Sequence, residues 1–264
     1  METDKEGIMK ARISCALCFV AIAPLGAHDS GVLVLRAQDV PHAASSAAPL
    51  VASTPTRSSI VDRFLADTEQ TLTSYRALRR LSVIARGGKM TAALTAQTSL
   101  DPVNGFQYNV LEESGSGMLR TKVLHGVLEA ERDAKRREKG AHGALTTANY
   151  RFEAGEATPD GLLRVAIYPL RKDALLMEGS ILLTNDDADL VRMEGLLVKR
   201  PSFWTRKVQV VRDYGRIGGV RVPLATGSTA DILFAGQSTF SMTYEYESIN
   251  DVPVRSPIAA ALRR

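Results

Sequence analysis

Apolar and polar residues alternate with a period of two along much of the chain, most regularly between about Asp160 and Glu247. From Thr239 to Glu247, every second residue is large and apolar, and the residues between them are small, hydroxylic or acidic. This pattern is typical of a β-strand that meets water on one face only. Its repetition predicts an antiparallel sheet with one dry face.

Two other segments have apolar residues at the spacing of a helix. The first runs from Ser59 to Tyr75 and begins with Ser59 and Asp62, which resemble a capping box. Its apolar face is formed by Ile60, Phe64, Leu65, Thr68, Leu72 and Tyr75. The second segment runs from Met118 to Lys139 and ends near Gly140. Each apolar stripe predicts a helix that covers a sheet face.

Strands are predicted between and after these helices, separated by the Gly, Asn and Asp residues of tight turns. Three alternating sets precede the second helix, at 81–85, 90–96 and 106–110. Others follow it, at 148–153, 162–168, 176–184, 190–199, 207–214, 220–225, 229–234 and 240–246. Pro169 and Pro223 have no backbone N–H, so we expect them at strand ends, edges or bulges.

The N-terminal region predicts export. Lys10 and Arg12 precede a short apolar run, which is typical of a secretory signal whose translation starts at Met9. A segment rich in Ala, Ser and Pro follows and predicts a disordered tether. The expected organisation of this soluble, periplasmic protein is a signal peptide at 1–27, the tether at 28–57, one domain at 58–251 and a tail at 252–264.

The sequence contains little that predicts catalysis. Cys15 and Cys18 lie within the predicted signal, so we expect no disulfide in the mature chain. His125 and His142 have no partners at the spacing of a zinc site, and we find no nucleophile elbow or phosphate-binding loop. We therefore expect no enzyme, no metal and no cofactor. The net charge of +4 would suit nucleic acid, but export makes that partner unexpected.

The order of elements and several short motifs resemble a known group. The motifs are Tyr168-Pro169-Leu170, Gly179 to Leu183, Val191 to Gly195, Pro201 to Trp204, Tyr214 to Pro223, and Tyr244 with Tyr246. Over Ser58 to about Asp251 the chain is similar to the LolA/LolB/RseB superfamily of periplasmic lipoprotein-binding proteins. The resemblance implies an α+β fold in which a strongly curved antiparallel sheet forms an unclosed half-barrel, with two helices over its concave face. It also implies an apolar cavity for a lipid or an acylated lipoprotein.

The candidate ligand-binding residues are apolar and aromatic side chains on the dry face of the predicted strands. They are Leu94, Phe106, Tyr108, Val110, Val165, Ile167, Val208, Val210, Phe240, Met242 and Tyr244. The same residues would also suit a filled core, as expected for the alternative function of an envelope interaction or sensor module. A candidate patch for an envelope protein or an anionic membrane surface consists of Lys199, Arg200, Trp204, Arg206 and Lys207.

Overall fold

The computed structural model describes residues 57–67, 70–136, 143–200, 205–233 and 236–254. The helical elements are α3 (Arg57–Ala66), α4 (Gly117–Leu119), the π-helical turn η2 (Arg120–Leu124) and α5 (His125–Arg136). The strands are β1 (Tyr75–Ala85), β2 (Met90–Asp101), β3 (Gly105–Gly115), β4 (Tyr150–Ala157), β5 (Leu162–Pro169), β6 (Met177–Thr184), β7 (Leu190–Leu197), β8 (Thr205–Ile217), β9 (Val220–Ile232), β10 (Gly236–Ile249) and β11 (Val252–Pro253).

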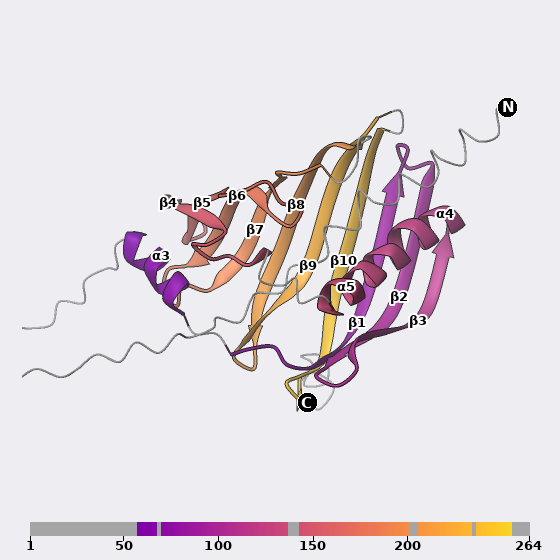
Figure 1. Cartoon of the computed structure of the whole chain (residues 1–264), viewed down its shortest axis with the longest axis horizontal. Helices are drawn as coiled ribbons and strands as arrows, with labels where there is room; N and C mark the ends of the chain where they lie inside the picture. Colours follow the sequence, from indigo (N-terminus) through magenta and orange to yellow (C-terminus); the bar gives the residue numbers. More distant parts are fainter. Residues whose placement is uncertain (1–56, 68–69, 137–142, 201–204, 234–235, 255–264) are drawn as a thin grey trace, which may run out of the picture.

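The described strands form one antiparallel sheet in the order β3-β2-β1-β10-β9-β8-β7-β6-β5-β4, with β11 paired to β10 (Figure 1). The pairing of β1 with β10 joins the first three strands to the later ones. In this order β3 and β4 are the two edges, so the sheet is not closed. The mostly antiparallel sheet with its helices confirms the predicted α+β class.

One face of the sheet can be followed through the strand register, because directly paired residues point to the same side. A single row crosses from β2 to β4 through Ala92, Val83, Phe240, Ser228, Val210, Gly195, Gly179, Ile167 and Phe152. We call this side the inner face. The helix formed by α4, η2 and α5 packs on it at β1 to β3, and α3 packs at the opposite end beside β4 (Figure 1).

Several predicted element boundaries are wrong. The first helix ends at Ala66 rather than at Tyr75, which begins β1. Tyr75 fits the apolar stripe of a helix, but as a strand residue it pairs with Leu100 on one side and Ile249 on the other. The strands predicted at 220–225 and 229–234 are one strand, β9, because Gly227 continues the ladder between Val211 and Ser241.

Other predicted details are confirmed. Pro169 ends β5, and Pro223 lies next to the bulge at Asp213 and Tyr214. The second helix, predicted at 118–139, occupies 117–136, and its predicted continuation to 139 lies outside the described residues. The predicted signal peptide, almost all of the tether and most of the tail also lie outside the described ranges.

Candidate functional site

The predicted ligand-binding residues lie on the inner face, but they fall into two clusters. Beneath α4, η2 and α5 is the cluster that we call the α5 cluster, to which α3 does not contribute. It includes Leu94, Phe106, Phe240 and Met242, with the partly buried Tyr108, Val110 and Tyr244 packed against it. The second, the α3 cluster, includes Val165, Ile167, Val208 and Val210 together with Ile60, Val61 and Phe64 of α3.

Polar side chains separate the two clusters on the central strands. Thr226 and Ser228 of β9 and Arg212 of β8 are all buried. The register pairs Thr226 with both Met242 and Arg212, so these polar groups interrupt an otherwise apolar row. The predicted residues therefore share one sheet face without forming one continuous apolar surface.

The α5 cluster is closely packed. Phe240 and Met242 are 0% exposed, and the helix buries Leu124, Val127 and Leu128 against them and their neighbours. Because the helical stripe fills the space above these strands, the side chains pack as a protein interior does. In this conformation an apolar ligand can reach the cluster only if the helix moves.

A buried ion pair joins this helix to the sheet. Arg79 of β1 is 2% exposed, and its two terminal nitrogens contact Glu131 of α5 at 2.5 Å and 3.0 Å. The guanidinium also donates a hydrogen bond to the hydroxyl of Tyr75. Its central carbon lies 4.6 Å from the ring centroid of Tyr244 and 5.1 Å from that of Phe106. We call these five residues the Arg79 centre.

Burial governs the electrostatics of this centre. Burial is the largest single influence on Arg79 and opposes its charge, but the Glu131 carboxylate together with the Tyr75 and Tyr244 hydroxyls outweighs it, so the pKa of Arg79 lies well above its ordinary value. Burial also raises the pKa of Tyr244 to about 12 and raises that of Tyr75 further. One turn beyond Glu131, burial lowers the pKa of Lys135. The guanidinium of Arg79 is therefore charged and the phenols of Tyr75 and Tyr244 are neutral at physiological pH.

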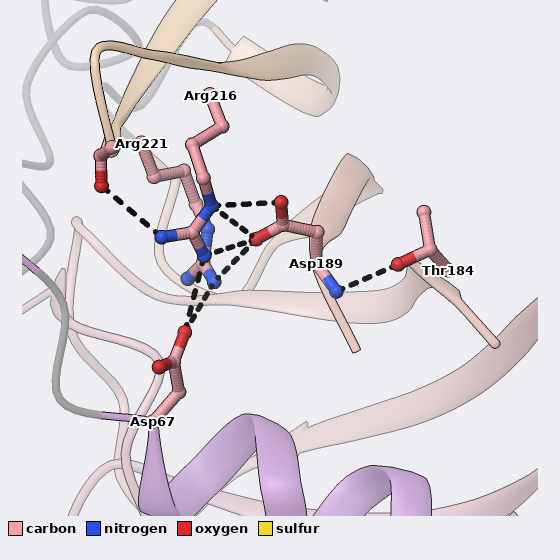
Figure 2. A network of polar contacts seen from close by, with 6 residues as sticks. Asp67, Thr184, Asp189, Arg216 and Arg221 are labelled. Atoms are coloured by element: carbon pink, nitrogen blue, oxygen red, sulfur yellow. Dashed lines mark hydrogen bonds and ion pairs between the residues drawn. The ribbon is translucent and has the colours of Figure 1, made fainter. Parts of the chain in front are cut away.

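A second polar network holds the end of α3 (Figure 2). Arg216 donates to both oxygens of Asp189, at 3.0 Å and 2.8 Å from its Nε, and contacts Asp67 at 3.1 Å. Arg221 lies 3.3 Å from Asp189 and 3.6 Å from Asp67. The backbone N–H of Asp189 in turn donates to Thr184. The two guanidinium groups, from the β8–β9 hairpin, thus join the residue after α3 to the residue before β7.

The same region fixes α3 in two further ways. The guanidinium of Arg221 lies 5.2 Å from the ring centroid of Phe64, and burial lowers the pKa of Arg221 to about 10 while Asp67 opposes that shift. Arg63 donates to the carbonyls of Asn185 and Asp186, at 2.8 Å each. The segment 185–189, between the strands predicted at 176–184 and 190–199, therefore helps to hold α3 in place.

A pocket of about 340 Å³ lies between α3 and the edge strand β4. It is lined by Val61, Asp62, Leu65, Thr147, Tyr150, Arg151 and Phe152. None of the predicted ligand-binding residues lines it, although Val61 and Tyr150 belong to the α3 cluster. Its volume is at the lower end of the range of small-molecule sites, roughly 300–1,000 Å³.

The predicted partner-binding patch is only partly described. Lys199 and Arg200 follow β7, Arg206 and Lys207 lie in β8, and all four are exposed. Trp204 lies outside the described residues. The described part of the patch is therefore a set of exposed cations in β8 and in the segment that follows β7.

The Arg79 centre was not predicted, although the sequence contains a signal for it. Arg79 interrupts the alternating apolar series Ala77, Leu81 and Val83, and an inward-facing charge in a half-buried strand requires a partner. The partner, Glu131, follows the apolar stripe of the helix by one turn. Neither residue by itself identifies the other.

Comparison with known families and with curated proteins finds no match to this chain. Among the described helices, none is long and apolar enough to cross a membrane. The described residues also contain no group of three or more His, Cys, Asp or Glu side chains placed to hold a metal ion.

Proposed function

We propose that the protein is exported to the periplasm, where it binds a lipid or an acylated lipoprotein on the inner face of its sheet. In this proposal the sheet is a strongly curved half-barrel, and α4, η2 and α5 form a movable cover over its concave face. The protein acts by binding rather than by catalysis. The resemblance to periplasmic lipoprotein-binding proteins agrees with this role.

The observation that carries the proposal is the two-layer construction of the α5 cluster. The buried apolar side chains of the cover face strands that supply the other half of the cluster. These side chains are Leu119, Val123, Leu124, Val127 and Leu128. Without the helix those strands would expose a largely apolar surface around Arg79, which must be covered by something equally apolar. An acyl chain has that character and can exchange with the helix.

The pocket between α3 and β4 supports the same proposal. An apolar group can be placed in this pocket without moving an element, because Val61, Leu65 and Phe152 supply apolar walls. It adjoins the α3 cluster through Val61 and Tyr150.

The test exploits competition between the helix and the ligand. Leu128→Ala removes a fully buried contact of the cover, whereas Leu163→Ala removes a similarly buried contact on β5 in the α3 cluster. Each should lower the free energy of unfolding by about 2–5 kcal/mol. Only Leu128→Ala weakens closure of the cover, so it should tighten binding of a fluorescent fatty acid by about tenfold or more. No binding by either variant or by the unchanged protein would exclude a lipid ligand.

The close packing of the α5 cluster favours a second candidate, an envelope interaction or sensor module with a filled core. Met242 and Phe240 are completely buried, as in an ordinary interior. In that case the exposed cations Lys199, Arg200, Arg206 and Lys207 would bind an acidic partner protein. Equal fatty-acid affinities for the two leucine variants, at a level no higher than for an unrelated protein, would favour this module.

A further inference from the structure

The two layers of the Arg79 centre carry different charges. The sheet contributes Arg79 and the hydroxyls of Tyr75 and Tyr244, whereas the carboxylate of Glu131 is contributed by the helix. Arg212 of β8 is also near enough to influence the pKa of Tyr244. The sheet side of the centre is therefore cationic, and its balancing anion belongs to the cover.

This division has a consequence when the cover opens. Movement of α5 would take Glu131 away and leave Arg79 among Tyr75, Phe106 and Tyr244 on an apolar face. A poorly hydrated guanidinium without an anion is strongly unfavourable. Another oxyanion that reached this position would restore the lost interactions.

The groups left on the sheet suit such an oxyanion. The two terminal nitrogens of Arg79 already hold a carboxylate through two hydrogen bonds, and its Nε is buried without a partner. The hydroxyl of Tyr75 lies 3.5 Å from the same carboxylate. A carboxylate or phosphate could therefore take the place of the Glu131 side chain without rearrangement of the sheet.

We propose that Arg79, with Tyr75 and Tyr244, binds the carboxylate or phosphate head group of an anionic amphiphile, which replaces Glu131 when the cover opens. The inference rests on the proposed function and adds the chemical class of the ligand. The acyl chain then lies on the α5 cluster, and the head group lies at the Arg79 centre. Glu131 acts as an internal substitute for the ligand in the closed state.

The first experiment compares dodecanoate with its neutral glycerol monoester, using the full chain and displacement of a fluorescent fatty acid. Dodecanoate should bind at least about tenfold more tightly, because a charge-assisted hydrogen bond is lost with the ester. The preference should disappear in Arg79→Gln. Equal binding of the two compounds would overturn the head-group site and leave the proposed function standing. Binding of neither compound would overturn both proposals.

The second experiment removes the competing carboxylate. Glu131→Gln keeps the size of the side chain, so dodecanoate should bind this variant at least about tenfold more tightly than it binds the unchanged protein and should raise its Tm. The matched control is Glu129→Gln on the same helix, because Glu129 contacts Tyr108 and Arg132 rather than Arg79. Unchanged affinity in Glu131→Gln would overturn the exchange of anions. If acetate raised the Tm of Glu131→Gln as much as dodecanoate does, an acyl chain would not be needed, and the assignment of an amphiphilic ligand would be overturned.

Discussion

Removal of one member of the Arg79–Glu131 pair should destabilise the protein far more than removal of both. Arg79 is 2% exposed, and the side chain of Glu131 is 10% exposed, so neither charge can regain much hydration in the folded state. Glu131→Leu leaves the guanidinium without its carboxylate and should cost about 3–5 kcal/mol. This is a large part of a typical total stability of about 5–15 kcal/mol. The double variant Arg79→Met with Glu131→Leu replaces both charges by apolar groups and should lose less than about 2 kcal/mol.

The assay is chemical denaturation of the unchanged protein, both single variants and the double variant, analysed as a double-mutant cycle. The surface pair of Arg80 and Glu245 is a matched control, because both of its side chains are more than half exposed. Its cycle should give a coupling of less than about 1 kcal/mol. The reasoning fails if Glu131→Leu costs less than about 1 kcal/mol, or if the double variant is as unstable as the sum of the single variants.

Three further predictions concern other parts of the structure. Burial raises the pKa of Tyr150 and of Tyr244 to about 12; because an unfolded tyrosine titrates near 10, the stability they contribute is complete below about pH 10 and is lost as the pH rises toward about 12. Chemical denaturation at about pH 9 and about pH 11 should therefore show that the free energy of unfolding falls by about 1 kcal/mol for each of these two tyrosines between the two pH values. The fall should be smaller in Tyr150→Phe. Asp67→Ala removes the carboxylate 3.1 Å from Arg216 and should speed proteolysis within α3, whereas the exposed Asp62→Ala should not. In chemical denaturation, Gly195→Ala should cost more than about 2 kcal/mol because a Cβ atom would overlap the backbone of Glu178, whereas Gly227→Ala, with ordinary contacts, should cost less than about 1 kcal/mol.

Most strands were predictable because the alternation of apolar and polar residues along a strand indicates which side chains face the interior. The pattern from Phe240 to Tyr246 gave both the strand and its buried side, and every second residue of β10 in this stretch is indeed buried or partly buried. The boundary between α3 and β1 was not predictable from spacing. Tyr75 suits either a helical stripe or a strand, and its pairing with Ile249 and Leu100 on the two neighbouring strands decides for the strand.

The candidate site depended on contacts between distant parts of the chain. The strand at 81–85 was predicted from its apolar residues alone, so the inward-facing Arg79 was left outside it. Its aromatic neighbour Tyr244 comes from β10 through the pairing of β1 with β10, and its anion comes from α5. The network of Asp67, Asp189 and Arg216 likewise joins three separate segments. No local spacing contains this information.

The central claim is that a ligand replaces the helix on the inner face of the sheet. Hydrogen exchange of the full chain, measured with and without saturating dodecanoate, tests it most directly. We expect the amides of α5, His125–Arg136, to lose protection when the ligand binds, while those of β1 and β10 keep theirs. Bound dodecanoate with unchanged protection in α5 would contradict the claim and would show that the ligand lies elsewhere.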